Sequence, residues 1–262
     1  MRAVLRKLPL GSFESRLRIG AVVRPHYALC MYYAAVEAKM LGYHAVTVIE
    51  LGVAGGNGLV CLCRHRKAIQ EELGIEIVVL GFDMETGLPE SEDPRDLLYY
   101  WKPGTYEMNR GSLEKTIAGQ ATLILGDVSK TLEHWNSDPQ APLGAVIFDL
   151  DFYTSTMAAF TLFDKSDLLP RVYCYFDDIC SAPDGAMTDR IGEREAIRQF
   201  NCASQREALQ DYLSQAFIFE GMAPEHWHQQ IYLYHRLSHP KYNLYVGGRR
   251  GNQQDALRLE TR

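Results

Sequence analysis

Short apolar runs recur along the chain, and each of them ends in an acidic residue. The first run, VTVI at residues 46–49, is apolar and β-branched, which is typical of a strand buried on both faces. Four further runs follow: IEIVVLGFD, ATLILGD, GAVIFDLD and RVYCYFDD. The segment from Pro25 to Gly42 has small and apolar residues at helical spacing, and a second amphipathic segment follows the first strand. This alternation predicts an α/β fold with a mostly parallel sheet and helices on both faces.

The end of the chain has a different pattern. GEREAIRQF and REALQDYLSQAF predict two helices, whereas QQIYLYHRLSH and KYNLYVGG alternate on either side of a His-Pro turn. We expect these last two segments to form an antiparallel C-terminal hairpin. No repeat or linker interrupts the chain, so we divide it into an N-terminal arm (residues 1–24), one domain (25–247) and a polar tail (248–262).

Composition argues against several classes of function. The chain has 262 residues and a formal net charge of −6, which argues against a nucleic-acid partner. It has no apolar stretch long enough to span a membrane and no signal-peptide pattern. Its six cysteines form no C-x-x-C pair, which argues against zinc and disulfides. We therefore expect a cytoplasmic protein that binds neither nucleic acid nor membranes.

The first predicted strand leads into a glycine-rich turn, VIELGVAGGNGL. A strand, a glycine-rich turn and a helix in this order are typical of nucleotide-binding units. The spacing is not the dinucleotide pattern G-x-G-x-x-G. Glu50, Gly52 and Gly56 instead resemble the first motif of class I S-adenosylmethionine-dependent methyltransferases, with Ala54 in place of the middle glycine. We predict that these three residues contact S-adenosylmethionine, and a glycine-rich loop of another α/β protein is the alternative.

Two acidic residues at the ends of later strands are candidates for the same cofactor. Asp83 ends the second strand, where one carboxylate can accept hydrogen bonds from both ribose hydroxyls. Asp127 ends the third strand, where methyltransferases often have a polar residue beside the adenine. The alternative for each is a structural cap, at the strand end for Asp83 and at the start of a helix for Asp127.

Four carboxylates follow the next two predicted strands: Asp149, Asp151, Asp177 and Asp178. The ends of neighbouring parallel strands lie at one edge of a sheet, so these side chains would repel one another. A bound cation or protonation would relieve this repulsion. Oxygen ligands without His or Cys select a hard cation such as magnesium, Mg2+. The alternative is that the aspartates cap the elements that follow them.

Longer stretches resemble one family. Between Arg24 and Phe200, RPHYALCMYYAAVEAKMLG, VIELGVAGGNGL, GDVSKTL, DLDFYTST, YFDDI and GEREAIRQF resemble the metal-dependent O-methyltransferases related to macrocin O-methyltransferase. Leu150 departs from that family, which usually has glycine there. The resemblance implies a Rossmann-like, mostly parallel seven-stranded sheet. It also implies that Mg2+ is held by Asp149, Asp177 and Asp178, that Asp149 also lies beside the cofactor, and that Asp151 is the catalytic base.

We therefore expect an S-adenosylmethionine-dependent, magnesium-dependent O-methyltransferase. Its partner would be a small-molecule acceptor, most naturally a sugar of a natural product that offers two adjacent hydroxyls to one metal ion. A homo-oligomer is left open. The aromatic residues of the connection at 84–117 would either cover the acceptor or pack at the sheet edge.

Two rival functions come from other classes. A haloacid dehalogenase-type phosphatase also has a D-x-D-x-T motif and a later Asp-Asp pair, but Tyr153 stands where that motif needs threonine. The glycine-rich unit also precedes the motif, which normally opens such a chain. The second rival is a non-catalytic protein of the methyltransferase fold that binds a cofactor or a partner.

Overall fold

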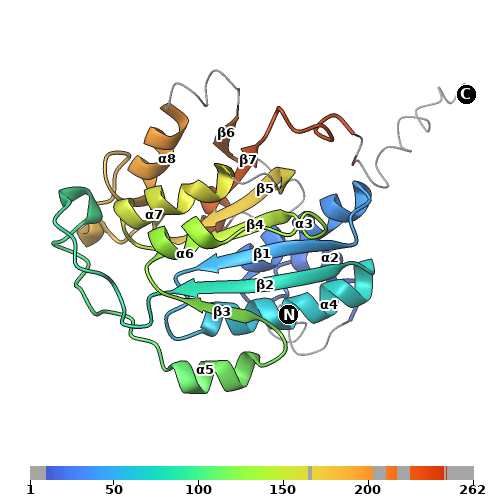
Figure 1. Cartoon of the computed structure of the whole chain (residues 1–262), viewed down its shortest axis with the longest axis horizontal. Helices are drawn as coiled ribbons and strands as arrows, with labels where there is room; N and C mark the ends of the chain where they lie inside the picture. The colour runs from blue at the N-terminus through green and yellow to red at the C-terminus, as the bar shows by residue number, and fades with distance from the viewer. Residues whose placement is uncertain (1–9, 165–166, 203–210, 217–224, 245, 247–262) are drawn as a thin grey trace, which may run out of the picture.

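One β-sheet forms the centre of the molecule (Figure 1). The computed structural model describes residues 10–164, 167–202, 211–216, 225–244 and 246. Within these residues, seven strands lie in the order β3-β2-β1-β4-β5-β7-β6. The first five in this order run parallel, whereas β7 is antiparallel to both β5 and β6. The strands are β1 (Ala45–Leu51), β2 (Glu76–Asp83), β3 (Thr122–Leu125), β4 (Leu143–Phe148), β5 (Leu168–Phe176), β6 (Tyr212–Gln215) and β7 (Ile231–His235). The predicted mostly parallel seven-stranded sheet is confirmed.

Two helical layers flank the sheet (Figure 1). The first contains α2 (Phe13–Arg18), α3 (Pro25–Met40), α4 (Asn57–Leu73) and α5 (Arg110–Ile117), and the second contains α6 (Val128–His134), α7 (Tyr153–Ala159) and α8 (Gly192–Cys202). Short 3-10 helices are η1 (Pro94–Asp96), η2 (Phe160–Asp164), η3 (Asp177–Ile179), η4 (Pro183–Gly185) and η5 (His226–Gln230).

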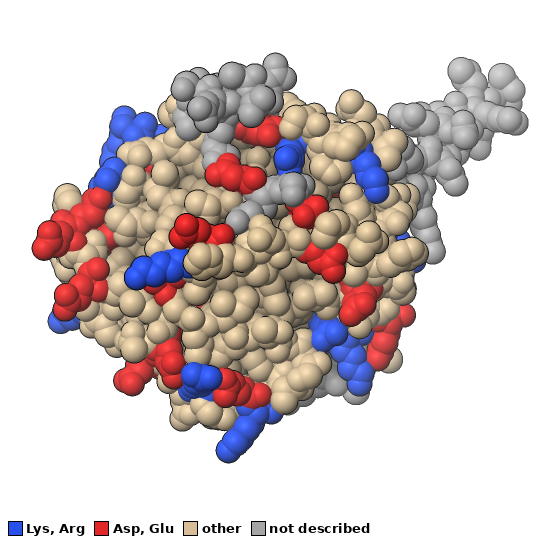
Figure 2. All heavy atoms as spheres, viewed as in Figure 1, with Lys and Arg blue, Asp and Glu red and all other residues tan. Residues whose placement is uncertain are grey.

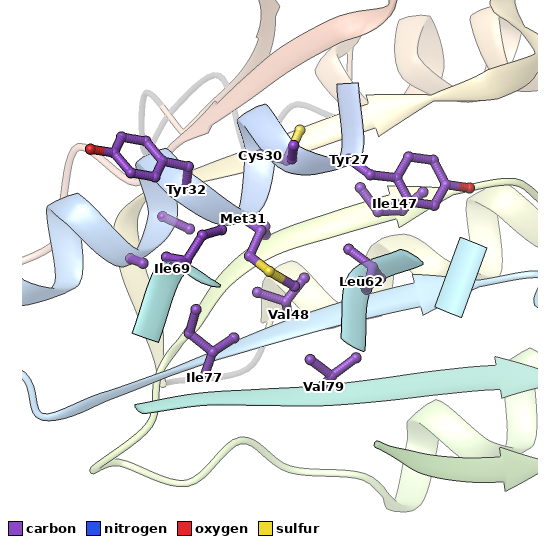
Figure 3. Packing of buried hydrophobic residues seen from close by; sticks show 14 of the residues in the cluster. Tyr27, Cys30, Met31, Tyr32, Val48, Leu62, Ile69, Ile77, Val79 and Ile147 are labelled. Carbon is purple, nitrogen blue, oxygen red and sulfur yellow. The ribbon is translucent and has the colours of Figure 1, made fainter. Parts of the chain in front are cut away.

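The central strands are apolar because helices cover both of their faces. Val46 and Val48 of β1 pack in one hydrophobic cluster, whereas Ile49 and Leu51 pack in the other. Alternate residues of β1 therefore face opposite layers, as the two-residue period of a strand requires. Figure 3 shows the first of these clusters, in which Met31 of α3 packs beside Val48.

The first 24 residues include a packed helix. Phe13 and Leu17 of α2 are buried, and Glu72 at the end of α4 accepts hydrogen bonds from the N–H groups that begin α2. Arg24 then precedes α3 with left-handed backbone angles, and Pro25 occupies the first position of that helix. A backbone N–H at this position would have no partner within the helix, so proline loses no hydrogen bond there. Residues 1–9 lie outside the described residues.

The prediction of a helix through DYLSQ is wrong. Tyr212–Gln215 instead form β6, which pairs with β7. The side chain of Asn201, near the end of α8, bonds to both the N–H and the C=O of Leu213, and Leu213 is 2% exposed. These tertiary contacts outweigh the local helix preference. The first part of the predicted helix, residues 206–210, lies outside the described residues.

The antiparallel C-terminal strands were predicted correctly, but one of them was assigned to the wrong segment. β7 falls where QQIYLYH predicts it, yet its partners are β5 and β6, and residues 240–243 form a turn. Arg171 donates a hydrogen bond to the carbonyl oxygen of Tyr242, and Lys241 donates one to the carbonyl oxygen of Leu41. These bonds hold the turn against the body of the molecule. The predicted tail at 248–262 lies outside the described part of the chain.

Acidic and basic side chains are interspersed on the face of the molecule in Figure 2. None of the helices in the described part of the chain is long and apolar enough to cross a membrane.

Candidate functional site

A cavity of about 700 Å³ opens at the carboxyl ends of the parallel strands. Its walls come from the segments that follow all five parallel strands and from the start of α3. The sheet order reverses between β1 and β4, and ligands of open α/β sheets bind at such a reversal. All but one of the residues that the sequence proposed for the cofactor, the metal or catalysis line this one cavity, namely Glu50, Gly52, Asp83, Asp127, Asp149, Asp151, Asp177 and Asp178. The exception is Gly56, where a Cβ would lie 2.3 Å from Cδ1 of Leu113. Gly56 is the residue before α4, with φ at +83°.

Gly52 lets two loops approach each other closely. Its φ is +84°, and a Cβ there would lie 1.8 Å from the backbone oxygen of Asp149. The turn after β1 is thus packed directly against the segment after β4. The glycine that the motif requires at this position therefore fixes where Asp149 lies relative to the glycine-rich turn.

Gly58, the second residue of α4, makes room for a buried carboxylate. Glu50 of β1 is 1% exposed, and its Oε1 lies against Gly58 while its Oε2 has no hydrogen-bond partner. Burial and the nearby charge of Asp149 raise the pKa of Glu50 well above its usual range. A buried acid with an unpartnered oxygen is unfavourable for folding, which suggests that Glu50 is retained to meet a ligand.

We expect Gly58→Ala to destabilise the protein by at least about 2 kcal/mol. A Cβ at this position would lie 1.8 Å from Oε1 of Glu50 and 2.8 Å from Cε2 of Tyr27, and both side chains are buried. Thermal unfolding followed by circular dichroism measures the effect. Gly55→Ala is the matched control, because a Cβ there meets no atom within 4 Å. Equal destabilisation by both substitutions would contradict this account of Gly58.

Asp83 holds the glycine-rich turn in shape. Its Oδ2 accepts hydrogen bonds from the N–H groups of Val53 and Ala54, both at 2.8 Å, and its Oδ1 accepts one from the N–H of Glu85 at 2.6 Å. The strand-end cap that the sequence offered as the alternative is therefore present. A carboxylate has about four acceptor positions, so Asp83 keeps capacity for a ligand in the cavity.

Asp127 caps α6. Its Oδ1 accepts hydrogen bonds from the backbone N–H of Ser129 at 2.8 Å and from the hydroxyl of the same residue at 2.6 Å. These bonds hold the pKa of Asp127 below its usual range. The capping alternative is thus present here too, and Asp127 nevertheless lines the cavity.

Three aspartates converge after β4 and β5. One carboxylate oxygen from each of Asp149, Asp177 and Asp178 lies within 4.8 Å of the other two, and no other such group of His, Cys, Asp or Glu occurs among the described residues. Oδ2 of Asp178 is buried without a hydrogen-bond partner. Burial, together with the neighbouring carboxylates, raises the pKa of both Asp149 and Asp178 well above the usual range. A divalent cation would relieve the repulsion between these carboxylates, because the three oxygens are hard ligands at a suitable spacing.

Asp151 lies beside this cluster in a strained conformation. Its φ of +60° is in the left-handed region, where residues other than glycine are uncommon, and it is only 6% exposed. Burial and then the charge of Asp149 raise the pKa of Asp151 to about 8. A strained, buried acid with a raised pKa is typical of a functional position.

Glu193 is a site residue that the sequence did not reveal. It is 0% exposed, and its Oε2 accepts a hydrogen bond from the N–H of Asp178 at 2.9 Å. Its other carboxylate oxygen has no partner. The stretch GEREAIRQF contains Glu193, but only the fold brings the start of α8 behind the Asp177-Asp178 pair.

Asp96 was missed as well, and it fixes the long connection after β2. Asp96 is fully buried and accepts hydrogen bonds from the N–H and the hydroxyl of Thr154 at 2.8 Å and 2.7 Å. This clamp joins the connection to the start of α7, close to Asp151. Of the aromatic residues in the connection, Trp101 and Tyr106 line the cavity, whereas Tyr99 bonds to the carbonyl oxygen of Gly185 outside it.

S-adenosylmethionine and Mg2+ both fit the residues present. The cavity volume is that of a typical small-molecule site. The glycine-rich turn brings backbone to its wall, and Glu50 offers an oxygen without a partner. The aspartate cluster supplies only oxygen donors, one of them without a partner, as a hard cation prefers.

No model of a known protein family matches the chain, and a search of curated proteins found no match. Among solved structures, the crystal structure of CalS11, a calicheamicin methyltransferase, is similar over 91% of this chain and 90% of its own, with 18% identity and a TM-score of 0.51. The apo structure of CalS11, described as a TDP-rhamnose 3′-O-methyltransferase, is similar over 91% and 92%, with 18% identity and a TM-score of 0.47. An rRNA methylase from Streptococcus thermophilus is similar over 77% and 91%, with 16% identity and a TM-score of 0.38. The likeness to the first of these concerns the fold: the chain has the Rossmann-like fold of the class I S-adenosylmethionine-dependent methyltransferases.

Proposed function

We propose that the protein is an S-adenosylmethionine-dependent, magnesium-dependent O-methyltransferase that acts on a hydroxyl of a small molecule. The observation that carries this proposal is the shared cavity: the glycine-rich turn and the aspartate cluster line the same space at the reversal of the sheet order. A cofactor on the turn would therefore lie next to a metal ion on the aspartates. The methyltransferase fold supports the same reading.

The cofactor would lie along the ends of β1, β2 and β3. Glu50 and the turn from Gly52 to Gly55 would contact its methionyl part, Asp83 its ribose and Asp127 its adenine. When bound, S-adenosylmethionine supplies a methyl group that its sulfonium already activates. The protein then has mainly to align the acceptor oxygen with that methyl group.

Asp149, Asp177 and Asp178 would hold Mg2+. When bound, Mg2+ would favour the ionised forms of these carboxylates and lower the pKa of a coordinated acceptor hydroxyl. The carboxylate of Asp177 is oriented by the hydroxyl of Tyr175, which donates to its Oδ1 at 2.6 Å. Glu193 instead holds the backbone N–H of Asp178, and so positions the main chain that carries this second proposed ligand.

Asp151 would accept the proton of the acceptor hydroxyl. In the proposed reaction, an acceptor O–C bond forms as the methyl C–S bond of the cofactor breaks, and the O–H proton passes to a carboxylate oxygen of Asp151. Without the metal, burial and the charge of Asp149 raise the pKa of Asp151 to about 8. Mg2+ on the neighbouring aspartates would favour the ionised form, which is the form that accepts a proton. The products are a methyl ether and S-adenosylhomocysteine.

We propose that the acceptor offers two adjacent hydroxyls, as a sugar of a natural product does. Two vicinal oxygens can coordinate one metal ion while one of them faces the methyl group. Trp101 and Tyr106 line the cavity and would provide flat apolar faces for a sugar ring.

The two rival functions fit the cavity less well. A haloacid dehalogenase-type phosphatase needs a lysine beside its aspartates, and the described residues that line the cavity include none. A non-catalytic protein of this fold has no need of a carboxylate cluster beside the cofactor turn, because burial and mutual repulsion of the aspartates are unfavourable for folding.

Methyl transfer to a panel of vicinal diols, both sugars and catechols, tests the proposal by mass spectrometry. We expect at least one diol to gain the mass of a CH2 group when Mg2+ is present and to remain unchanged when EDTA removes the metal. Equal transfer with and without EDTA would contradict the metal dependence. Release of phosphate from phosphorylated sugars would favour the phosphatase.

A further inference from the structure

Arg24 is the one positively charged side chain among the described residues that line the cavity. The cavity is otherwise strongly acidic. Its lining includes the carboxylates of Glu50, Asp83, Glu90, Asp127, Asp149, Asp151, Asp177 and Asp178. A single guanidinium in such surroundings marks the point at which a negatively charged group of a ligand could bind.

Arg24 forms no ion pair within the described part of the chain. Within the described part of the chain, no carboxylate oxygen lies within 4.0 Å of its guanidinium nitrogens, although Glu50 and Asp149 are in its electrostatic neighbourhood. Its guanidinium carbon lies 5.1 Å from the centre of the Tyr27 ring, a cation–π contact that orients the side chain. The guanidinium therefore keeps its donors for a ligand.

The backbone of Arg24 is strained as well. Its φ of 43° and ψ of 66° lie in the left-handed region, which arginine rarely adopts. The strain occurs where the chain enters α3, at the wall of the cavity. Such strain persists only when the surrounding structure holds it in place, and it is concentrated at ligand sites.

The glycine-rich turn has few other donors for a negatively charged group. The N–H of Gly52 bonds to the carbonyl oxygen of Phe82, and that of Gly56 bonds to the carbonyl oxygen of Val53. The N–H groups of Val53 and Ala54 are both taken by Asp83. The first N–H groups of α4, at Asn57 and Gly58, have no partner within the helix and remain as neutral donors, so Arg24 is the charged donor for an anion near the turn.

From these observations we propose that Arg24 binds the carboxylate of the methionyl part of S-adenosylmethionine. The inference rests on the proposed function. The cofactor has one carboxylate, while its ammonium and sulfonium groups are positive and its adenosine is neutral. Eight acidic residues could complement the positive groups, but Arg24 supplies the one positive charge among the described lining residues that could complement the carboxylate. Anchored there, the amino-acid chain would be held at the end of β1, and the choice of methyl donor would depend on Arg24.

The test compares two ligands that differ in the amino-acid part, which carries the carboxylate together with an ammonium group that arginine would repel. S-adenosylhomocysteine carries the whole amino acid, whereas 5′-deoxy-5′-methylthioadenosine has the same adenosine and a thioether sulfur without it. Calorimetric titration of both is done on the wild type, Arg24→Gln, Arg24→Lys and Arg64→Ala. Arg64 is an exposed arginine on α4 outside the cavity, so its substitution changes the net charge alone.

We expect Arg24→Gln to weaken S-adenosylhomocysteine binding by about 10- to 100-fold, the range for loss of a charge-assisted hydrogen bond, and to leave methylthioadenosine binding unchanged. Arg24→Lys should restore part of the loss, and Arg64→Ala should match the wild type. Equal weakening of both ligands by Arg24→Gln, or no weakening of either, would overturn the inference. A wild type that binds neither ligand would overturn the proposed function, and this inference with it.

Discussion

Asp178→Asn is expected to lower the rate of methyl transfer at saturating substrate by about 1,000-fold, or roughly 4 kcal/mol of transition-state stabilisation. Asp178 belongs to the only group of three acids within the described residues whose oxygens could meet one metal ion. Its Oδ2 is buried and has no hydrogen-bond partner, as expected of an oxygen that meets a ligand. Asparagine keeps the shape of the side chain but removes the negative charge that a hard cation requires. Initial rates measured across a Mg2+ titration test this expectation.

Three further readouts separate loss of the metal from loss of the fold. S-adenosylhomocysteine should bind Asp178→Asn within about threefold of the wild-type affinity, a change of less than 1 kcal/mol. Without metal, the variant should unfold at the same or a higher temperature than the wild type, since burial disfavours the charge that the substitution removes. Asp184→Asn, an exposed acid on η4, is the matched control and should be silent. Full Mg2+-dependent activity in Asp178→Asn would contradict the metal assignment.

Asp151→Asn is expected to lower kcat by about 100- to 10,000-fold while the Mg2+ and cofactor affinities stay near those of the wild type. Asp151 lies beside the aspartate cluster, lines the cavity and has a pKa raised to about 8. Its φ of +60° is one that asparagine also tolerates, so the substitution should remove the base without a change in backbone. Single-turnover rates with saturating acceptor isolate this step.

Chemical rescue distinguishes a base from a structural residue. In Asp151→Gly, the left-handed backbone is unstrained and a small space replaces the carboxylate. Added formate should restore part of the rate in proportion to its concentration if Asp151 accepts the proton. An unchanged kcat in Asp151→Asn would show that the base is another group.

Much of this site could be predicted because its residues follow strands that the sequence pattern reveals. VTVI, AVIF and VYCYF are buried on both faces, so they are apolar throughout and easily recognised. The acids after them mark the carboxyl ends of the strands, and a parallel sheet brings these ends to one edge. Asp149 and Asp178 are therefore neighbours for a reason that is visible before any coordinates exist.

Other parts of the site depend on contacts between distant segments. The bond from Thr154 to Asp96 joins residues 58 positions apart, and Asp178 and Glu193 are 15 positions apart. No spacing rule links such pairs, so their acids look like ordinary surface residues of a loop and a helix. Arg24 gave no signal either, because a left-handed arginine cannot be recognised from its neighbours in sequence.

The sequence pattern did not predict the strand β6, and the reason is related. Its four residues, YLSQ, lie in a stretch that has the composition of a helix. Only the edge of β7 and the side chain of Asn201 make an extended conformation favourable there. Local preference is weak enough for such partners to reverse it.

The most direct measurement is calorimetric titration of S-adenosylhomocysteine with and without Mg2+. It tests whether the glycine-rich turn and the aspartate cluster share one ligand-filled cavity. The account predicts micromolar binding in both conditions, together with a separate Mg2+ binding event that Asp178→Asn abolishes. Absence of S-adenosylhomocysteine binding in both conditions would contradict it and would make a non-catalytic or phosphatase function the better explanation of the cavity.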